Sequence, residues 1–138
     1  MRHSLCRLRT DQRGAGTVEL VIAMPLLLLL ILLIAQFALY EHATHIAQAA
    51  ASQALSAARV SGGSAAAGNT EGQRILTQLG SGPLHATSIN VQRGNNQAFV
   101  TISGEVLNII PFVTVTVHAE AVGPVEKFTS AVDTGAAP

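Results

Sequence analysis

The sequence contains only one cysteine, Cys6, so no disulfide can form within the chain and the fold must be stable without one. Cys6 precedes the long apolar run of the sequence, whereas a cysteine that carries a lipid anchor would follow such a run. We interpret Cys6 as a reduced cytoplasmic thiol with no special role, because unpaired thiols stay reduced in the cytosol.

Catalytic and ligand-binding patterns are also lacking. The sequence has no G-x-S-x-G, H-E-x-x-H or C-x-x-C pattern, and no phosphate-binding G-x-x-x-x-G-K-[ST] pattern. His42 and His45 could share one face of a helix, but two histidines without further ligands do not make a metal site. We therefore expect no catalytic residue, metal, cofactor or small-molecule substrate. A membrane-tethered enzyme would require a deep polar pocket in the outer part of the chain.

Charged residues are scarce and unevenly placed: they make up 12% of the sequence, about half the usual share. Residues 1–13 hold four arginines and one aspartate, a net charge of +3, whereas residues 41–138 hold four basic and six acidic groups, a net charge of −2. The basic side chains of the second part are too dispersed for a nucleic-acid-binding stripe. A basic head followed by an apolar segment and a mildly acidic body is typical of a membrane protein.

The apolar run covers residues 20–40, which read LVIAMPLLLLLILLIAQFALY and have no ionisable group except the phenol of Tyr40. Twenty-one helical residues reach about 31 Å, the thickness of a bilayer core. A helix is required there because lipid offers no partners to backbone polar groups. Pro25 lies in the first turns, where it can kink the helix without ending it. The sequence thus predicts a transmembrane helix over residues 15–40, with Tyr40 as an aromatic anchor at its far end.

The arginine-rich side of such a segment stays in the cytoplasm, so residues 41–138 are expected to face outward from the plasma membrane. A cleavable secretory signal is the alternative interpretation. It would have an apolar region of about 7–15 residues followed at once by a small-x-small site. The run here is longer, and the clearest later match, residues 47–49 (AQA), lies too far beyond its end.

The residues before the apolar run, 13–20, read RGAGTVEL. A glycine, four residues, a glutamate and then a long apolar helix is the arrangement of a type IV prepilin processing site, and the sequence here resembles the TadE family of pilin-like proteins. The resemblance is strongest over residues 13–60. It implies that a membrane-embedded prepilin peptidase cuts between Gly14 and Ala15 and removes residues 1–14 as a leader. Cleavage after Gly16 would leave Glu19 at the third mature position instead of the fifth, so we favour Gly14.

The resemblance also implies a function: a minor pilin or pseudopilin that serves as a structural or assembly component of a bacterial Tad/Flp pilus or secretion apparatus. The implied partners are membrane lipid, the major Flp pilin, other pilin-like subunits, the prepilin peptidase and the inner-membrane assembly platform. The major pilin of such systems is, by family pattern, much shorter than this chain. The alternative is an unprocessed single-pass protein that presents a small binding domain outside the cell.

Glu19 also has a physical argument of its own. A carboxylate carried into mid-membrane costs roughly 2.5–3.5 kcal/mol, and a nearby cation would offset that cost. Cleavage would create such a cation, the α-ammonium of Ala15, and Glu19 of one subunit could neutralise Ala15 of a neighbour and set the register of an assembly. The simpler interpretation is that Glu19 lies at the lipid headgroups, near a helix N-terminus whose dipole favours an acid.

Residues 41–60 contain no proline or glycine and are rich in alanine, so they predict a stalk helix that continues the membrane helix as one rod over residues 18–60. Small residues recur every three or four positions along one face. This seam can pack on other subunits, on the chain's own outer domain, or on both. The seam consists of Ala43, Ala47, Ala50, Ala54 and Ala57.

A small α+β domain is predicted for residues 61–128, beginning with a hinge at residues 61–64 (SGGS). Thr70 and Gln73 read as a capping box, which predicts a short helix from Thr70, as its N-cap, to Leu79; residues 64–69 could be helix or loop. Three stretches then alternate apolar and polar residues: around residues 89–91, over 98–102, and over 113–119, the clearest of the three.

These stretches predict a three-stranded antiparallel sheet whose apolar face is covered by the alanine-rich helix. The expected fold class is therefore pilin-like α+β: one long N-terminal helix, a short helix and a small sheet. Residues 129–138 are small and polar and are expected to form a disordered tail.

Overall fold

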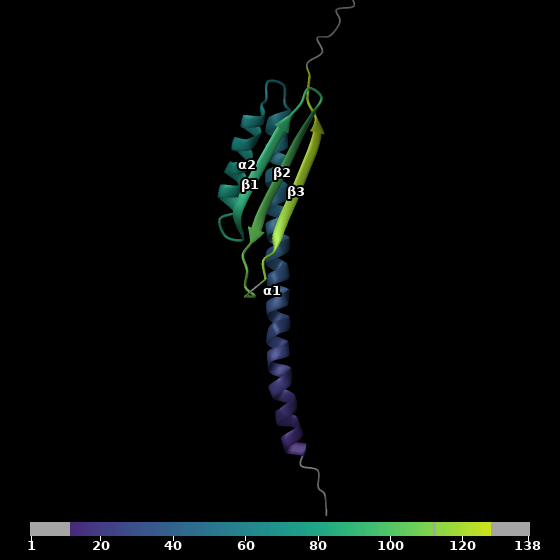
Figure 1. Cartoon of the computed structure of the whole chain (residues 1–138), viewed down its shortest axis with the longest axis vertical. Coiled ribbons are helices and arrows are strands. Elements are labelled where there is room, and N and C mark those ends of the chain that lie inside the picture. The colour runs from purple at the N-terminus through teal and green to yellow at the C-terminus, as the bar shows by residue number, and fades with distance from the viewer. Residues whose placement is uncertain (1–11, 112, 128–138) are drawn as a thin grey trace, which may run out of the picture.

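The computed structural model describes residues 12–127 except Phe112, with side chains from Gly16 onward. Cys6, most of the predicted leader and the predicted tail over residues 129–138 lie outside the described residues. The α+β class predicted from the sequence is confirmed, since a long helix and a short helix are followed by three strands (Figure 1). The elements are α1 (Gln12–Arg59), α2 (Ala65–Leu79), β1 (Leu84–Arg93), β2 (Gln97–Val106) and β3 (Thr116–Pro124).

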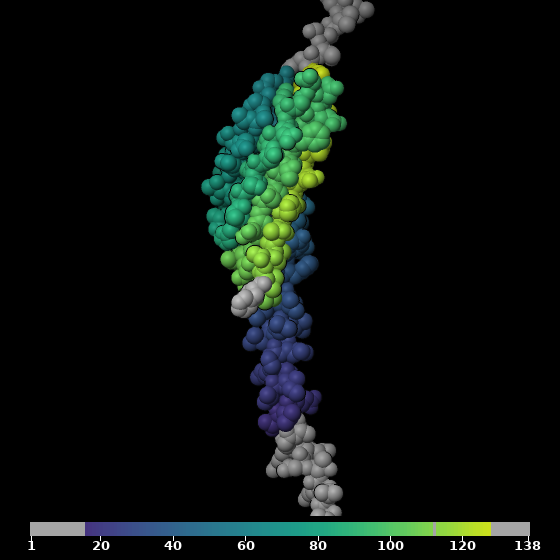
Figure 2. Space-filling view, viewed as in Figure 1, coloured from purple at the N-terminus to yellow at the C-terminus, as the bar shows by residue number. Residues whose placement is uncertain are grey.

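Helix α1 is unbroken for 48 residues, a length of about 72 Å, so the predicted membrane and stalk segments form one continuous helix. Pro25 lies inside this helix and does not end it. The first half of α1 extends beyond the domain as a narrow stem, and the second half runs behind the sheet (Figures 1 and 2). The same rod therefore has two environments along its length.

The sheet is an antiparallel meander with the strand order β1-β2-β3. Side chains of β2 alternate between exposed and buried, and the buried set, which includes Val100 and Ile102, faces α1 together with Val117 of β3. Helix α1 contacts β2 and β3, whereas α2 contacts α1 and β1. The alternation read from the sequence thus identifies the side of the sheet that the helices cover.

Helix α1 ends at Arg59 and α2 begins at Ala65, and the turn between them contains Gly62, whose φ of +79° is a left-handed backbone that glycine adopts readily. The predicted capping box at Thr70 is wrong. Helix α2 begins at Ala65, because the extended Ser64 places its Oγ where it accepts a hydrogen bond from the Ala67 N–H at 3.0 Å. Thr70 lies inside the helix and donates its hydroxyl to the Ala66 carbonyl.

Two buried glycines, Gly68 and Gly72, bring α2 unusually close to α1. A Cβ atom added at Gly68 would lie 2.8 Å from the Ala54 carbonyl oxygen and 2.9 Å from the Ala58 Cβ, and one at Gly72 would lie 3.1 Å from the Ala54 Cβ. Glycine lowers helix propensity, but here it removes the atoms that would separate the two backbones. The two helices therefore pack through alanine and glycine.

Strand β3 begins at Thr116, so the prediction that it begins at Val113 is wrong. Val113 is exposed and belongs to the connection after β2. Pairing resumes where the Val106 N–H donates to the Val115 carbonyl at 2.8 Å. Earlier in the same connection, Leu107 and Ile109 bond the side chain of Gln36 in α1, a contact between residues far apart in the sequence.

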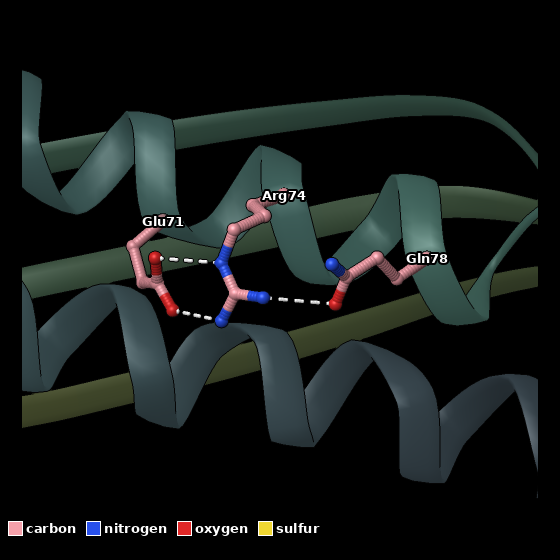
Figure 3. Close-up of polar contacts among 3 residues, drawn as sticks. All are labelled: Glu71, Arg74 and Gln78. Atoms are coloured by element: carbon pink, nitrogen blue, oxygen red, sulfur yellow. Dashed lines mark hydrogen bonds and ion pairs between the residues drawn. The ribbon is translucent and has the colours of Figure 1, made fainter.

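The outward side of α2 carries a polar cluster of Glu71, Arg74 and Gln78 (Figure 3). Hydrogen bonds from Arg74 hold the pKa of the Glu71 carboxyl below its ordinary value and raise the pKa of the Arg74 guanidinium. Because the pKa of Glu71 is lower in the folded protein than in the unfolded chain, its carboxylate stabilises the fold at pH values above its pKa in the unfolded chain. This contribution is lost as the pH falls through its pKa in the folded protein. Both side chains are solvated, so the cluster is a surface feature of the helix.

The close approach of the two helices predicts that Gly68→Ala destabilises the domain by about 1 kcal/mol or more, because overpacking outweighs the gain in helix propensity. Gly82→Ala is the matched control, since an added Cβ there meets nothing within 4 Å. Thermal unfolding of the full chain in detergent micelles, followed by circular dichroism, compares the two. An unchanged or higher midpoint for Gly68→Ala would show that the helices separate at no cost.

Candidate functional site

The predicted processing motif lies in the first turns of α1, which begins at Gln12. Gly14 and Ala15 are helical in backbone, and the described side chains begin after them. Glu19 is exposed. The two ion pairs among the described side chains are Arg59–Glu126 and Arg74–Glu71, and neither involves Glu19. The carboxylate of Glu19 therefore has room for a cation supplied from elsewhere.

The apolar segment after Glu19 exposes its side chains around the whole circumference of the helix. An 18-residue window of α1 reaches a mean hydropathy of 2.9, and none of that window is buried within the domain. In the part of the chain that the structure describes, α1 is the one helix long and apolar enough to cross a membrane. A helix with leucines exposed on every side fits a single-pass membrane segment, because none of this apolar surface would be buried if the helix stood in water.

Further along α1, the predicted alanine seam packs on the chain's own domain. Ala43, Ala47, Ala50 and Ala54 are each at most 1% exposed, in contact with the sheet and α2, whereas Ala57 is only half-buried. Two alanines outside the predicted seam, Ala51 and Ala58, are also buried, because the covered face is wide enough to contact two elements. A wider apolar stripe on the helical wheel was the signal that could have found them.

This packing also bears on the secretory-signal alternative. A cut after residue 49, at the small-x-small match, would fall within α1. It would remove Ala43, Ile46 and Ala47 from the hydrophobic core. The arrangement therefore favours a helix that keeps its apolar segment attached to the domain.

Gln36 marks the point where α1 enters the domain, and sequence reasoning missed it. Among the described residues, Gln36 is the polar side chain that is buried, with 7% of its surface exposed. Its Nε2 donates to the Leu107 carbonyl at 3.3 Å, and its Oε1 accepts from the Ile109 N–H at 2.9 Å. No local pattern reveals this pair of bonds, since its partners lie 71 and 73 residues away.

Arg93, the last residue of β1, bonds the C-terminal end of α1. Its Nη1 donates to the Ala58 carbonyl and to the Val60 carbonyl, the latter at 3.0 Å. The Arg59 carbonyl accepts from the Glu126 N–H at 2.9 Å. A guanidinium at a helix C-terminus satisfies unpaired carbonyls and complements the helix dipole.

The remaining candidate features are two histidines and two surface hollows. His42 and His45 are exposed, and among the described residues no three potential ligands gather to hold a metal ion. One surface hollow lies between the end of α2 and β1, and its lining holds no acid, histidine or cysteine. Another lies on the outer face of the sheet, where Glu120 is the single ionisable group. Neither hollow pairs a nucleophile with a base.

Comparison with known protein families gives a match for the N-terminal part of the chain. Residues 14–55 match the family model of TadE-like protein, which confirms the resemblance predicted from the sequence. The matched range holds Gly14, Glu19, the apolar segment and most of the alanine seam. No curated protein matches the chain, and no solved structure matches it.

The Arg93 cap predicts that Arg93→Ala lowers the free energy of unfolding by about 1–2 kcal/mol, because two helix carbonyls lose a charged donor. Hydrogen exchange should also quicken in the last turn of α1. Arg74→Ala is the control, since Arg74 is a solvated arginine with partners on its own helix, and its loss should be smaller. Equal losses for the two variants would remove the special role of Arg93.

Proposed function

We propose, from the TadE-like match over residues 14–55, that this chain is a pilin-like, single-pass membrane component of a bacterial Tad/Flp pilus or secretion apparatus. The observation that carries the proposal is the continuity of α1, which runs from the processing motif through a fully exposed apolar stem into the core of the domain. The role is that of a minor pilin or assembly component, with its domain outside the plasma membrane. The basic leader and the positive-inside rule support this orientation.

In this proposal a prepilin peptidase cuts between Gly14 and Ala15. The product keeps almost all of α1, and its new α-ammonium lies four residues, about 6 Å along the helix axis, from Glu19. A cation at that distance offsets the cost of a carboxylate at the edge of hydrocarbon. The same charge pair can form between neighbouring subunits and align them along the axis of an assembly.

The surface available for subunit contacts follows from the packing of α1. Its alanine face beyond residue 43 is already covered by the chain's own sheet and α2. Among the described residues, the stem over residues 20–34 has no side chain buried in the domain, and most of its leucines are exposed. We therefore place the contacts with the major Flp pilin and other pilin-like subunits on this stem, within the bilayer.

Processing predicts a specific mass change. Wild-type protein produced with a prepilin peptidase should lose residues 1–14 and begin at Ala15, whereas Gly14→Val should keep the leader, because a bulky side chain blocks the cleft of the peptidase. Gly16→Ala is the control and should be processed normally, since Gly16 lies in open space. Intact-mass analysis reads the result. An uncut N-terminus in every sample would favour the unprocessed-anchor alternative.

Glu19→Gln separates assembly from processing. It should leave cleavage and membrane insertion intact but lower recovery of cross-linked complexes with pilin-like partners about 10-fold, the effect of losing roughly 1.4 kcal/mol of charge pairing. Glu41→Gln, a half-buried acid beyond the apolar stem, is the matched control and should cross-link normally. Normal cross-linking by Glu19→Gln would reject the register role and leave Glu19 as a headgroup-level acid.

A further inference from the structure

The connection between β2 and β3 leaves the sheet at the end of the domain from which the bare stem of α1 emerges (Figure 1). We name residues 107–111 and Val113 the apolar loop and leave out Phe112, which lies outside the described residues. The stretch 106–117 reads VLNIIPFVTVTV and contains no Asp, Glu, Lys or Arg. Three of its large side chains face outward: Leu107 is 44% exposed, Ile109 41% and Val113 44%. An uncharged loop that exposes such residues is poorly suited to water.

The apolar loop is held against α1 by Gln36, which lies inside the apolar run of the helix. The side-chain amide of Gln36 bonds the Leu107 carbonyl and the Ile109 N–H, so both of its ends are used. The Leu107 N–H donates to the Pro83 carbonyl at 2.9 Å. Irregular backbone at the edge of a bilayer is stabilised where its polar groups have protein partners, and these bonds provide partners for the carbonyl and N–H of Leu107 and for the N–H of Ile109.

The position of Gln36 along the helix gives the depth of the loop. A hydrocarbon core of about 30 Å takes about 20 helical residues, so a span that begins after Glu19 ends near Leu39. Gln36 lies three residues before Leu39, so its bonds hold the loop about 4–5 Å inside the boundary of the hydrocarbon core. Phe37, the next residue of α1, is 64% exposed.

We propose that the apolar loop is a second membrane-binding element, which inserts its side chains into the outer interface of the bilayer beside α1. The occupant of this surface is lipid, because the surface is continuous with the stem and lies at the depth of the acyl boundary. The inference rests on the proposed membrane span of α1. Two attachments, one helix and one loop, fix the tilt and rotation of the outer domain, which one helix alone would leave free to turn.

The test places an environment-sensitive NBD fluorophore at three positions of the full chain, each as a single cysteine in a Cys6→Ser background. Ile109 reports on the apolar loop and Val21 on the stem. Asn95, exposed at the opposite end of the domain, is the control for water. The protein is reconstituted in vesicles of phosphatidylcholine and phosphatidylglycerol. Quenching is measured with lipids that carry a nitroxide at a shallow or a deep position, and with aqueous iodide.

We expect the Ile109 label to be quenched severalfold more by shallow lipid nitroxide than the Asn95 label, and to be protected from iodide. A lipid-quenched Val21 label beside an iodide-quenched Ile109 label would overturn the loop proposal while leaving the membrane span intact. An Ile109 label protected from both quenchers would also overturn it, since protein would then cover the loop. A water-accessible Val21 label would reject the span itself, and with it the proposed function.

The role of Gln36 is tested in the same system. Gln36→Leu removes both bonds to the loop and should lower lipid quenching of the Ile109 label at least twofold, with no change for the Val21 label. Gln53→Leu, an exposed glutamine on the same helix, is the matched control and should change neither label. Undiminished lipid quenching of Ile109 in Gln36→Leu would show that the loop inserts without this anchor.

Discussion

The structure depends on one constraint: α1 passes without a break from an exposed apolar stem to a buried alanine face. Bulky leucines in the first half offer apolar surface all round the helix, which suits lipid. Alanines in the second half bring the sheet and α2 close to the helix backbone, which suits a small core without a disulfide. Because the helix is continuous, the depth of the stem in a membrane also sets the height of the domain above it.

Each end of the buried half is fixed by one side chain: Arg93 reaches α1 from β1, and Gln36 reaches from α1 to the connection between β2 and β3. Arg93 holds the carbonyls of the last turn, and Gln36 bonds the connection that follows β2. Between them, Gly68 and Gly72 let α2 rest on the alanines. The domain is thus attached along its whole length to one side of α1, and motion of the helix must carry the domain with it.

This arrangement divides the molecule's surfaces by function. The alanine face is covered within the chain, so the proposed contacts with other pilin-like subunits fall on the stem; the match to TadE-like protein spans both parts of α1. In the proposal above, the apolar loop extends the lipid-facing surface from the stem onto the domain. Glu19 stands at the opposite end of the stem, where a trimmed amino terminus would supply its counter-charge.

The sequence by itself determined the features that depend on local spacing: the apolar run, the alternation that marks β2, the unbroken helix and the glycine-to-glutamate spacing of the TadE-like motif. Local pattern misplaced the start of α2, because Ser64 and Thr70 are both capable caps and tertiary packing favoured the longer helix. It also misplaced the start of β3. Only the tertiary structure decided that Ala58 lies deeper than Ala57, that Arg93 caps α1, and that Gln36 holds the apolar loop. Each of these depends on contacts between residues far apart in the sequence. The local spacing of residues along the chain carries no information about such contacts.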